Sequence, residues 1–342
     1  MFQSAITDTS QTIENLSRML RASRRMQAAF SSPEVASAVP SQVIRSASIF
    51  PSSSSIREFE HSAIVLQLYA AYENCVSSLV RLWLRELPNV VSNYQDLGSS
   101  FHHVHRVGVA GVLGKINYQR FSHLSADIVS LAFSECAAGH PEYEILPEAF
   151  IGENRTLKKD RLCELLSHIG VELGWDGVTQ HPIMKSAISD DYGDAETAES
   201  VLKDFVSYRN DAAHGRPNQI LGYDELLRAL RFIDCLCTAL AEVFSKSRVM
   251  RLINSGKAKE LGTVKEVFAQ PRAIVAELNS GSIRVGTQLI FHNQSQIVLG
   301  YVRELQLDGE KSQKIEIRNS IEVGIKLDVL PKKSMRVLID AG

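Results

Sequence analysis

The residues best suited to chemistry lie within one short stretch, residues 208–215, which reads YRNDAAHG. Asn210 and His214 are four positions apart, so on a helix they share one face, and the long side chain of Arg209 can reach toward them. At a helix C-terminus, unpaired carbonyls favour an imidazolium at His214. An imidazole that titrates near neutrality beside a fixed cation predicts proton transfer next to a phosphate, whose developing charge a guanidinium can stabilise.

A purely structural role would explain the same residues. His214 could cap the C-terminus of a helix, and Arg209 could be a surface charge paired with Asp211 or Asp204. Because two residues at one spacing recur by chance, the stretch needs support from the surrounding chain before it indicates a function.

Two other patterns are weaker. His102, His103 and His105 could bind a metal, as in a phosphohydrolase, but neighbouring positions on a helix do not all face one way and no carboxylate or Cys stands at ligand spacing beside them. A surface or interface patch of His is the favoured interpretation. The Gly-rich run 108–115 lacks the preceding strand and the Lys-Ser/Thr ending of a phosphate loop. We therefore predict no metal and no cofactor.

The elements that must position residues 208–215 are mainly helices. Residues 1–30 have helical spacing of apolar side chains, and the Ser- and Pro-rich segment 31–55 has the composition of a linker. Residues 56–87 contain no Gly or Pro and are apolar nearly all round, which predicts a buried central helix that Pro88 ends. We expect further helices at about 90–106, 120–138, 157–171, 195–213 and 223–254.

After Gly256 the pattern changes to short runs typical of strands, separated by turn residues. This density of strands predicts a small β-barrel or sandwich over residues 257–342, following a helical bundle over residues 56–256. The strand-rich part from residue 246 has 16 Lys/Arg against 10 Asp/Glu, whereas residues 51–245 have 16 against 26. Attraction to polyanions such as RNA is therefore expected from the C-terminal part.

The pattern Arg209-Asn210-x-x-Ala213-His214-Gly215 resembles the signature of the HEPN superfamily. The resemblance extends over residues 56–250 and includes Tyr72-Glu73 in the central helix, the segment 154–170 and the long closing helix. It is nearest to the RiboL-PSP branch of HEPN domains, which is found in prokaryotic conflict systems. The expected fold is thus multidomain, with an all-α HEPN bundle followed by a small all-β barrel.

The resemblance implies a metal-independent endoribonuclease whose site forms where two HEPN domains pair. In such enzymes the ribose 2′-hydroxyl attacks the adjacent phosphate and leaves a 2′,3′-cyclic phosphate. Here His214 would be the acid or base, Arg209 would hold the phosphate and Asn210 would orient the pair. Tyr208 and Arg216 are candidate RNA contacts. Arg216 stands where some HEPN toxins carry a Tyr that a partner enzyme modifies, so that control is not expected.

Glu73 and Asp211 are candidates for supporting roles. Glu73 is the sole carboxylate between Glu60 and Glu86 and lies on an apolar stripe of the central helix. A buried carboxylate needs a partner, and Arg209 is a reasonable one. An ion pair that only holds the bundle together is an equally good interpretation.

The C-terminal part also has a familiar pattern. Residues 282–289, 300–306 and 322–327 resemble the barrel that forms the second domain of elongation factor Tu and related translation GTPases. No GTPase motif accompanies it, so nucleotide hydrolysis is not implied. RNA docking and dimerisation or protein binding are both compatible with such a barrel.

The favoured function is a homodimeric ribonuclease, a toxin-like or antiviral effector acting on RNA, with tRNA as one candidate target and an antitoxin or other inhibitory protein as a possible partner. A non-catalytic RNA- or protein-binding module is the alternative. Five Cys, no basic segment before an apolar block at the start and no apolar run of about 20 residues predict a cytoplasmic protein.

Overall fold

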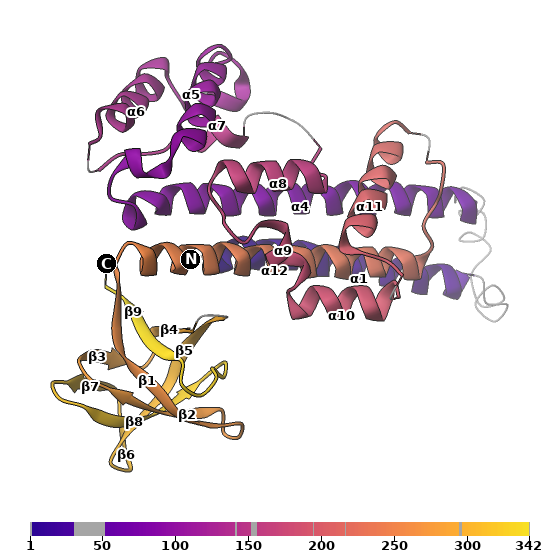
Figure 1. The fold of residues 1–342 in the computed structure, drawn as a ribbon. Coiled ribbons are helices and arrows are strands. Elements are labelled where there is room, and N and C mark those ends of the chain that lie inside the picture. Colours follow the sequence, from indigo (N-terminus) through magenta and orange to yellow (C-terminus); the bar gives the residue numbers. More distant parts are fainter. Residues whose placement is uncertain are drawn as a thin grey trace. The chain divides into compact units, whose positions relative to one another are not determined.

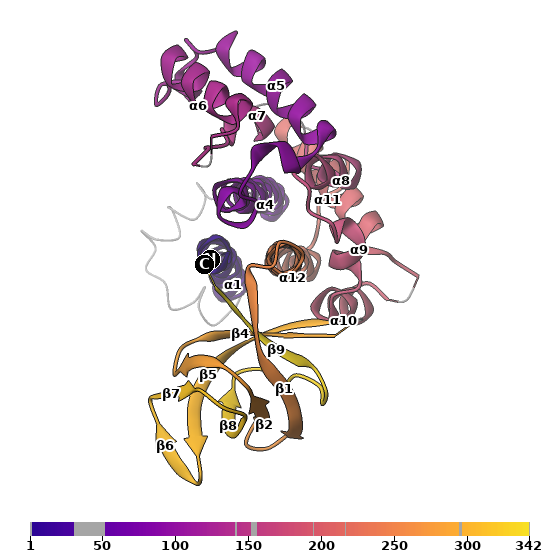
Figure 2. The same ribbon diagram turned by 60° about the vertical axis from the view of Figure 1, so that its left-hand side comes forward.

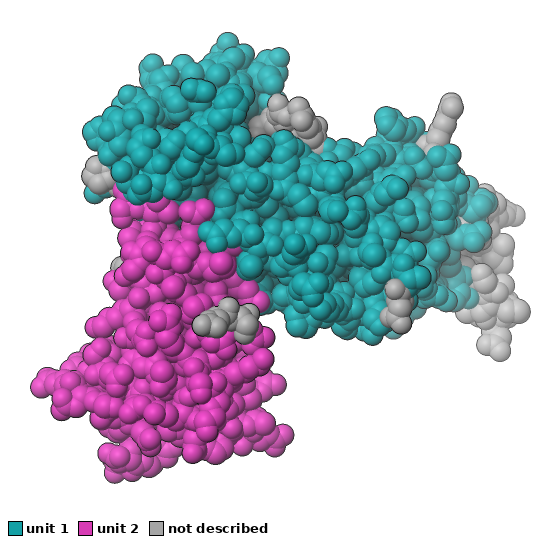
Figure 3. All heavy atoms as spheres, in the orientation of Figure 1, with its two compact units in different colours: residues 1–88, 93–245 teal, residues 89–92, 246–342 magenta. Residues whose placement is uncertain are grey.

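The computed structural model describes residues 2–30, 52–140, 142–151, 156–193, 195–215, 217–293 and 296–341. The chain divides into two compact units (Figure 3). The first comprises residues 1–88 and 93–245, and the second comprises residues 89–92 and 246–342. The candidate site, residues 208–215, lies in the first unit.

Helices make up the first unit. They are α1 (Gln3–Phe30), α4 (Ser53–Val90), α5 (Ser99–Leu113), α6 (Ala126–Ala138), α7 (Glu148–Ile151), α8 (Lys159–His168), α9 (Gly174–Thr179), α10 (Pro182–Asp191), α11 (Ala198–Ala213) and α12 (Tyr223–Asn254), with short 3-10 turns η1 (Tyr94–Leu97) and η2 (Gln119–Phe121). The last turns of α4 and α12 belong to the second unit.

Three long helices, α1, α4 and α12, form the centre of the first unit (Figures 1 and 2). Figure 2 looks nearly along their axes, with α8 to α11 on one side and α5 to α7 beyond α4. Trp83 of α4 and Phe244 of α12 are almost completely buried and meet edge to face with ring centroids 6.0 Å apart. The Trp83 indole N–H donates to the carbonyl of Ile169 at 2.8 Å, which fixes the C-terminal end of α8 against α4. Burial of such aromatic surface is the main stabilising contribution here.

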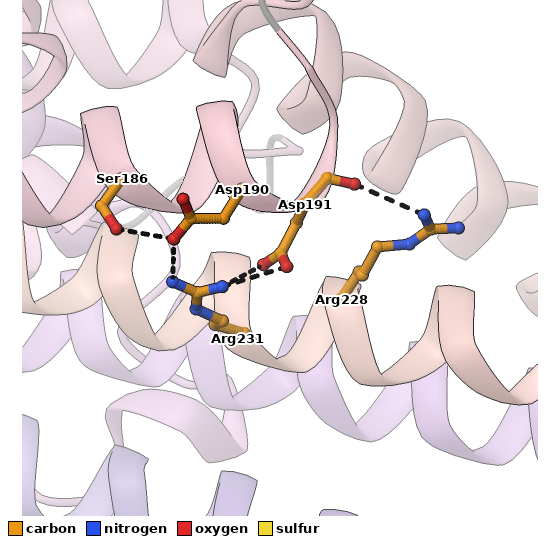
Figure 4. Close-up of polar contacts among 5 residues, drawn as sticks. All are labelled: Ser186, Asp190, Asp191, Arg228 and Arg231. Carbon is orange, nitrogen blue, oxygen red and sulfur yellow. Dashed lines mark hydrogen bonds and ion pairs between the residues drawn. The ribbon is translucent and has the colours of Figure 1, made fainter.

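Charged side chains hold α10 on the outer face of α12 (Figure 4). The Arg231 guanidinium of α12 donates to Asp190 at 2.9 Å and to both carboxylate oxygens of Asp191 at 3.0 Å. Ser186 donates to Asp190 at 2.8 Å, and Arg228 donates to the Asp191 carbonyl at 3.4 Å. These contacts fix orientation more than they add stability, because the Arg231 and Asp190 side chains are about half-exposed, although Asp191 is mostly buried.

The predicted end of the central helix, at residue 87, was wrong by three residues, because α4 continues through Pro88 to Val90. Pro88 cannot donate a backbone hydrogen bond, but in the last turn it removes only one bond from the helix. Lys257 Nζ donates to the exposed carbonyl of Asn89 at 2.7 Å and so satisfies one of the groups left unpaired at the helix end. The helix also begins at Ser53, inside the segment expected to be a linker, whereas residues 31–51 of that segment lie outside the described residues.

Two predicted helices are each divided in the structure. The expected helix at 90–106 is η1 followed by α5, separated at Gly98, which has a φ of +86° that an L side chain rarely adopts. The expected helix at 120–138 is η2 followed by α6, whose cap Ser125 accepts a hydrogen bond from Ile128 N–H at 3.2 Å. In both cases the cap residue stops the chain from continuing as one helix.

By length and composition alone, α4 could cross a membrane, and it is the one helix among the described residues that passes this test. However, 56% of its most apolar window is buried within the protein, as in the core helix of a globular domain. The buried Tyr72 hydroxyl donates to the Leu157 carbonyl at 3.3 Å, so this face of α4 packs on protein backbone.

The second unit is a closed β-barrel, which resolves the open choice between barrel and sandwich. Its strands are β1 (Ala258–Phe268), β2 (Ala273–Leu278), β3 (Gly281–Arg284), β4 (Gln288–His292), β5 (Ile297–Leu307), β6 (Glu310–Ser312), β7 (Lys314–Ile317), β8 (Ile321–Leu327) and β9 (Arg336–Asp340). Six of them pair in the order β4-β9-β1-β2-β8-β5, and β5 pairs with β4 to close the ring. β6 extends β5 outside the ring, and β3 pairs separately with β7.

The barrel interior is filled by alternating apolar side chains, among them Phe291, Leu305 and Ile325, which are fully buried. The last turns of α12 join this unit, where Val249 packs against β-strand side chains and Arg248 forms an ion pair with Asp340 of β9. Closure leaves no free strand edge in the six-stranded ring.

Candidate functional site

Local sequence determines where α11 begins and ends. Thr197 accepts a hydrogen bond from Ser200 N–H at 3.1 Å, and Ser200 Oγ accepts one from Thr197 N–H at 2.9 Å, which forms a capping box. Leu202 and Phe205 bury one face of the helix in the core. At the other end Gly215 has a φ of +68°, so the helix stops directly after the chemical residues and presents them at its C-terminus.

The Arg209 guanidinium lies over the aromatic ring of Tyr69 on α4, 4.2 Å from the ring centroid. Its Nη1 donates to the Asn210 side-chain oxygen at 3.1 Å. Cation–π contacts of this kind contribute roughly 0.5–2 kcal/mol. Within the described part of the chain Arg209 forms no ion pair with a carboxylate. The guanidinium is therefore oriented by a ring and an amide, and its positive charge remains uncompensated.

His214 is the C-cap residue of α11, and its side chain is exposed. Its backbone N–H donates to the Asn210 carbonyl at 3.1 Å, so the helical turn continues through His214 and places Asn210 one turn away, as the spacing predicted. Among the described residues no side chain forms a hydrogen bond with the imidazole. No hydrogen bond joins it to Arg209 either, so both groups are free to contact a ligand.

The predicted environment of Glu73 was wrong. Its side chain is half-buried, and within the described residues it forms no ion pair with Arg209. The apolar stripe on which it lies is exposed in its N-terminal part, with Phe59 at 74% and Leu66 at 36% of full exposure, and buried at Val80 and Leu84. Glu73 and Arg209 nevertheless both lie near Tyr69: burial raises the pKa of the Tyr69 phenol, the Glu73 charge raises it further and the Arg209 charge lowers it. Glu73 thus lies near the Tyr69 ring but does not neutralise the charge of the Arg209 guanidinium.

Asp211 and Tyr208 are partly buried around the motif. Asp211 accepts a hydrogen bond from the Asn218 side chain at 3.1 Å, which ties the segment after α11 back to the helix. The Tyr208 ring meets His61 of α4 edge to face, with centroids 6.3 Å apart. Tyr208 stays a candidate RNA contact through its accessible part, whereas Arg216 lies outside the described residues.

Two residues near the motif were not singled out from the sequence. Tyr69 carries the guanidinium, and its hydroxyl oxygen accepts the Leu157 backbone N–H at 2.9 Å. His61 is fully buried and accepts the Leu221 N–H at 3.1 Å, and burial lowers its pKa although the Asp211 and Glu225 charges raise it. Neither had a sequence signal of its own, because an aromatic or a single His in an apolar helix is usually core.

The three His of α5 do not form a metal site. His102 Nε2–H donates to the Tyr94 carbonyl at 2.9 Å, a hydrogen bond of 2.8 Å joins His105 Nδ1 to the Tyr94 hydroxyl, and His103 is exposed beside Arg106. Among the residues that the structure describes, no group of three His, Cys, Asp or Glu could hold a metal ion. The phosphohydrolase hypothesis therefore has no site in this part of the chain.

The architecture and the motif together are those of a HEPN domain: a helical bundle in which an Arg-polar-x3-His stretch ends a helix beside the central one. The family model described as RiboL-PSP-HEPN matches residues 41–246, and the chain belongs to that family. The expected fold class, a HEPN helical bundle followed by a β-barrel, is thereby confirmed.

Other comparisons add little. No curated protein matches the chain. Two crystal structures of the C-terminal domain of a protein described as a U32 peptidase, from Geobacillus thermoleovorans, are 10% identical to it. One, a selenomethionine variant, covers 23% of this chain and 96% of its own, with a TM-score of 0.21. The other covers 25% and 93%, with a TM-score of 0.22.

Proposed function

We propose that the protein is a metal-independent endoribonuclease of HEPN type. The observation that carries the proposal is the end of α11, where a guanidinium with no carboxylate partner and an exposed imidazole lie within two helical turns. Arg209 binds the scissile phosphate, Asn210 holds the guanidinium, and His214 moves the proton. The 2′-oxygen forms a bond to phosphorus as the 5′-oxygen leaves, giving a 2′,3′-cyclic phosphate and a 5′-hydroxyl.

The reaction needs one group to remove the proton of the 2′-hydroxyl and another to protonate the leaving oxygen. Residues 208–215 of one chain supply a single imidazole, His214. We therefore propose that two copies pair and that their two His214 side chains serve as base and acid.

An exposed apolar stripe on α4 supports pairing of two copies at this place. Phe59 and Leu66 are exposed, and Leu66 and Glu73 lie one turn to either side of Tyr69, the residue that carries Arg209. Large exposed apolar side chains on one helix are typical of an interface. Pairing along this stripe would bring the two Arg209–His214 sets together.

The remaining parts of the proposal concern context. The excess of Lys and Arg from residue 246 onward supports RNA docking by the barrel, with tRNA as one candidate substrate. An active ribonuclease in a cell needs restraint, so an inhibitory partner such as an antitoxin fits a toxin-like or antiviral role in the cytoplasm.

The direct test is cleavage of end-labelled RNA by the purified protein in the presence of EDTA. We expect cyclic-phosphate ends from the wild type and no detectable cleavage from Arg209→Ala or His214→Ala. Arg106→Ala and His140→Ala are matched controls, because both side chains are exposed and lie outside the motif. Cleavage by either motif variant at the wild-type rate would disprove the assignment, and RNA that is bound but never cut would favour the binding-module alternative.

A further inference from the structure

A pocket lies in the first unit, away from the end of α11. It is formed by α5, η2, α7 and α8 and has a volume of about 390 Å³. That volume is within the range of small-molecule sites and too small for a folded partner. None of the residues proposed for RNA cleavage lines it.

Two Gly of α5 create the pocket. At Gly108 an added Cβ would lie 1.9 Å from the Ala149 carbonyl oxygen, so this Gly lets α7 pack directly on α5. At Gly111 an added Cβ would have no atom within 4 Å, although the residue is helical and lines the pocket. The first Gly therefore closes the wall and the second leaves the interior open.

The pocket has an apolar floor and a basic rim. Phe121 and Phe150 are buried beneath it, and Val107, 56% exposed, lies at its edge. Lys115 and Arg120 are exposed at the rim, and within the described residues neither forms an ion pair. Arg120 lies over the Phe121 ring, 4.6 Å from its centroid, so one cation is held directly against the aromatic floor.

The acidic groups of the pocket are already occupied. Glu148 is almost completely buried, forms an ion pair with Arg81 and lies 3.5 Å from His123 Nε2. Arg161 pairs with Glu164 at 2.7 Å. Because the opposite charges within each of these pairs cancel, the charges of Lys115 and Arg120 make the pocket net positive.

We propose that this pocket binds a nucleoside monophosphate. Lys115 and Arg120 contact the phosphate, and the planar base lies against Val107 at the edge of the apolar floor. A free cation pair next to an apolar cavity suits a ligand with one anionic end and one flat, weakly polar end. The site is independent of the ribonuclease proposal, because it shares no residue with the end of α11.

The test is isothermal titration calorimetry of the full-length protein with AMP, GMP, CMP and UMP, and separately with inorganic phosphate and with adenosine. We expect at least one nucleotide to bind at least about tenfold more tightly than phosphate or nucleoside, since each of these supplies only half of the contacts.

Two variants locate the site. Lys115→Ala/Arg120→Ala should weaken nucleotide binding by at least about tenfold through loss of the phosphate contacts. Gly111→Leu should abolish binding by filling the cavity, and it should fold normally because its side chain enters open space in a helix. Arg25→Ala/Lys203→Ala removes two exposed cations elsewhere and should bind like the wild type. Circular dichroism verifies the fold of each variant.

Three results would overturn the proposal. No heat with any nucleotide at roughly millimolar concentration would remove the ligand class. Phosphate that binds as tightly as the nucleotides would remove the role of the apolar floor. Binding that persists unchanged in Gly111→Leu, or that occurs only with an oligonucleotide, would place the nucleotide elsewhere or assign the pocket to RNA. None of these outcomes depends on whether RNA is cleaved.

Discussion

Two regions of the helical unit carry His in patterns that suggest chemistry, but their His side chains differ in burial and in hydrogen bonding. In α5, His102 and His105 both bond to Tyr94, and His105 is packed between Phe150 and Phe133 with ring centroids 5.6 and 5.4 Å away. At the end of α11, His214 is exposed and has no side-chain partner among the described residues.

The difference separates a His that supports the fold from a His that a ligand can reach. His105 has a fixed partner and a ring environment that excludes water, and burial together with the His102 charge lowers its pKa to about 4. Such an imidazole stabilises the fold but cannot reach a substrate. The His214 side chain is exposed, so a ligand can reach it, as proton transfer to or from a substrate requires.

The largest effect expected is on catalysis. His214→Ala should lower the rate of RNA cleavage by roughly 10² to 10⁴, the usual contribution of a general acid or base, with no measurable change in the free energy of unfolding. Cleavage rates and urea unfolding on the same samples measure both. A loss of stability that accompanies the loss of cleavage would mean that the two His differ less than the structure indicates.

The reverse pattern is expected for the buried residue. His105→Ala should lower the free energy of unfolding by about 3 kcal/mol, because it leaves a cavity among aromatic rings and removes the partner of the Tyr94 hydroxyl. RNA cleavage per folded molecule should remain at the wild-type level. Tyr94→Phe in the same background serves as the control, since a smaller added loss in the double variant would identify the shared hydrogen bond.

Acid should affect the buried region first. The pKa of His105 is about 4 in the folded protein and about 6.5 in the unfolded chain. Between these values the unfolded state binds more protons, so stability falls as the pH decreases from 6.5, by roughly 2 kcal/mol at pH 4.5. Urea unfolding at several pH values measures this slope. His105→Phe cannot titrate at this position and should flatten the slope; an unchanged slope would assign it to other groups such as His61, whose pKa is also lowered.

The smallest effect is expected for His102→Ala. This ring is half-buried, stacks on Tyr94 with centroids 4.6 Å apart and donates one hydrogen bond to a backbone carbonyl. Its loss should reduce stability by about 1 kcal/mol. A thermal shift as large as that of His105→Ala would contradict the ranking by burial.

Long, regular patterns were predictable from the sequence. The last helix was expected at 223–254, and α12 occupies Tyr223–Asn254, because its apolar positions repeat at a constant 4-3 spacing. The short strands β3 and β6, at Gly281–Arg284 and Glu310–Ser312, have too few residues to show a clear periodicity in the sequence.

The burial of individual side chains was harder to predict. The central helix is apolar on nearly every side, so its pattern could not show which face packs inward, and Phe59 proved to be exposed while Tyr69 is buried. The contact between Arg209 and Tyr69 joins two helices about 140 positions apart in sequence, and no local spacing indicates it. The residues of the motif could therefore be predicted from the sequence, whereas the Tyr69 ring that contacts Arg209 could not.

That supporting ring has a consequence of its own. Tyr69 is held on its face by Arg209 and at its hydroxyl by the backbone of Leu157, two residues before α8 begins. A substrate phosphate that drew the guanidinium off the ring would therefore change the position of Tyr69 and, through Leu157, of the start of α8. A shift of α8 would in turn move Tyr69 and the Arg209 guanidinium. In the proposed ribonuclease, this phenol would therefore couple RNA binding by Arg209 to the packing of α8, which supplies none of the proposed catalytic residues.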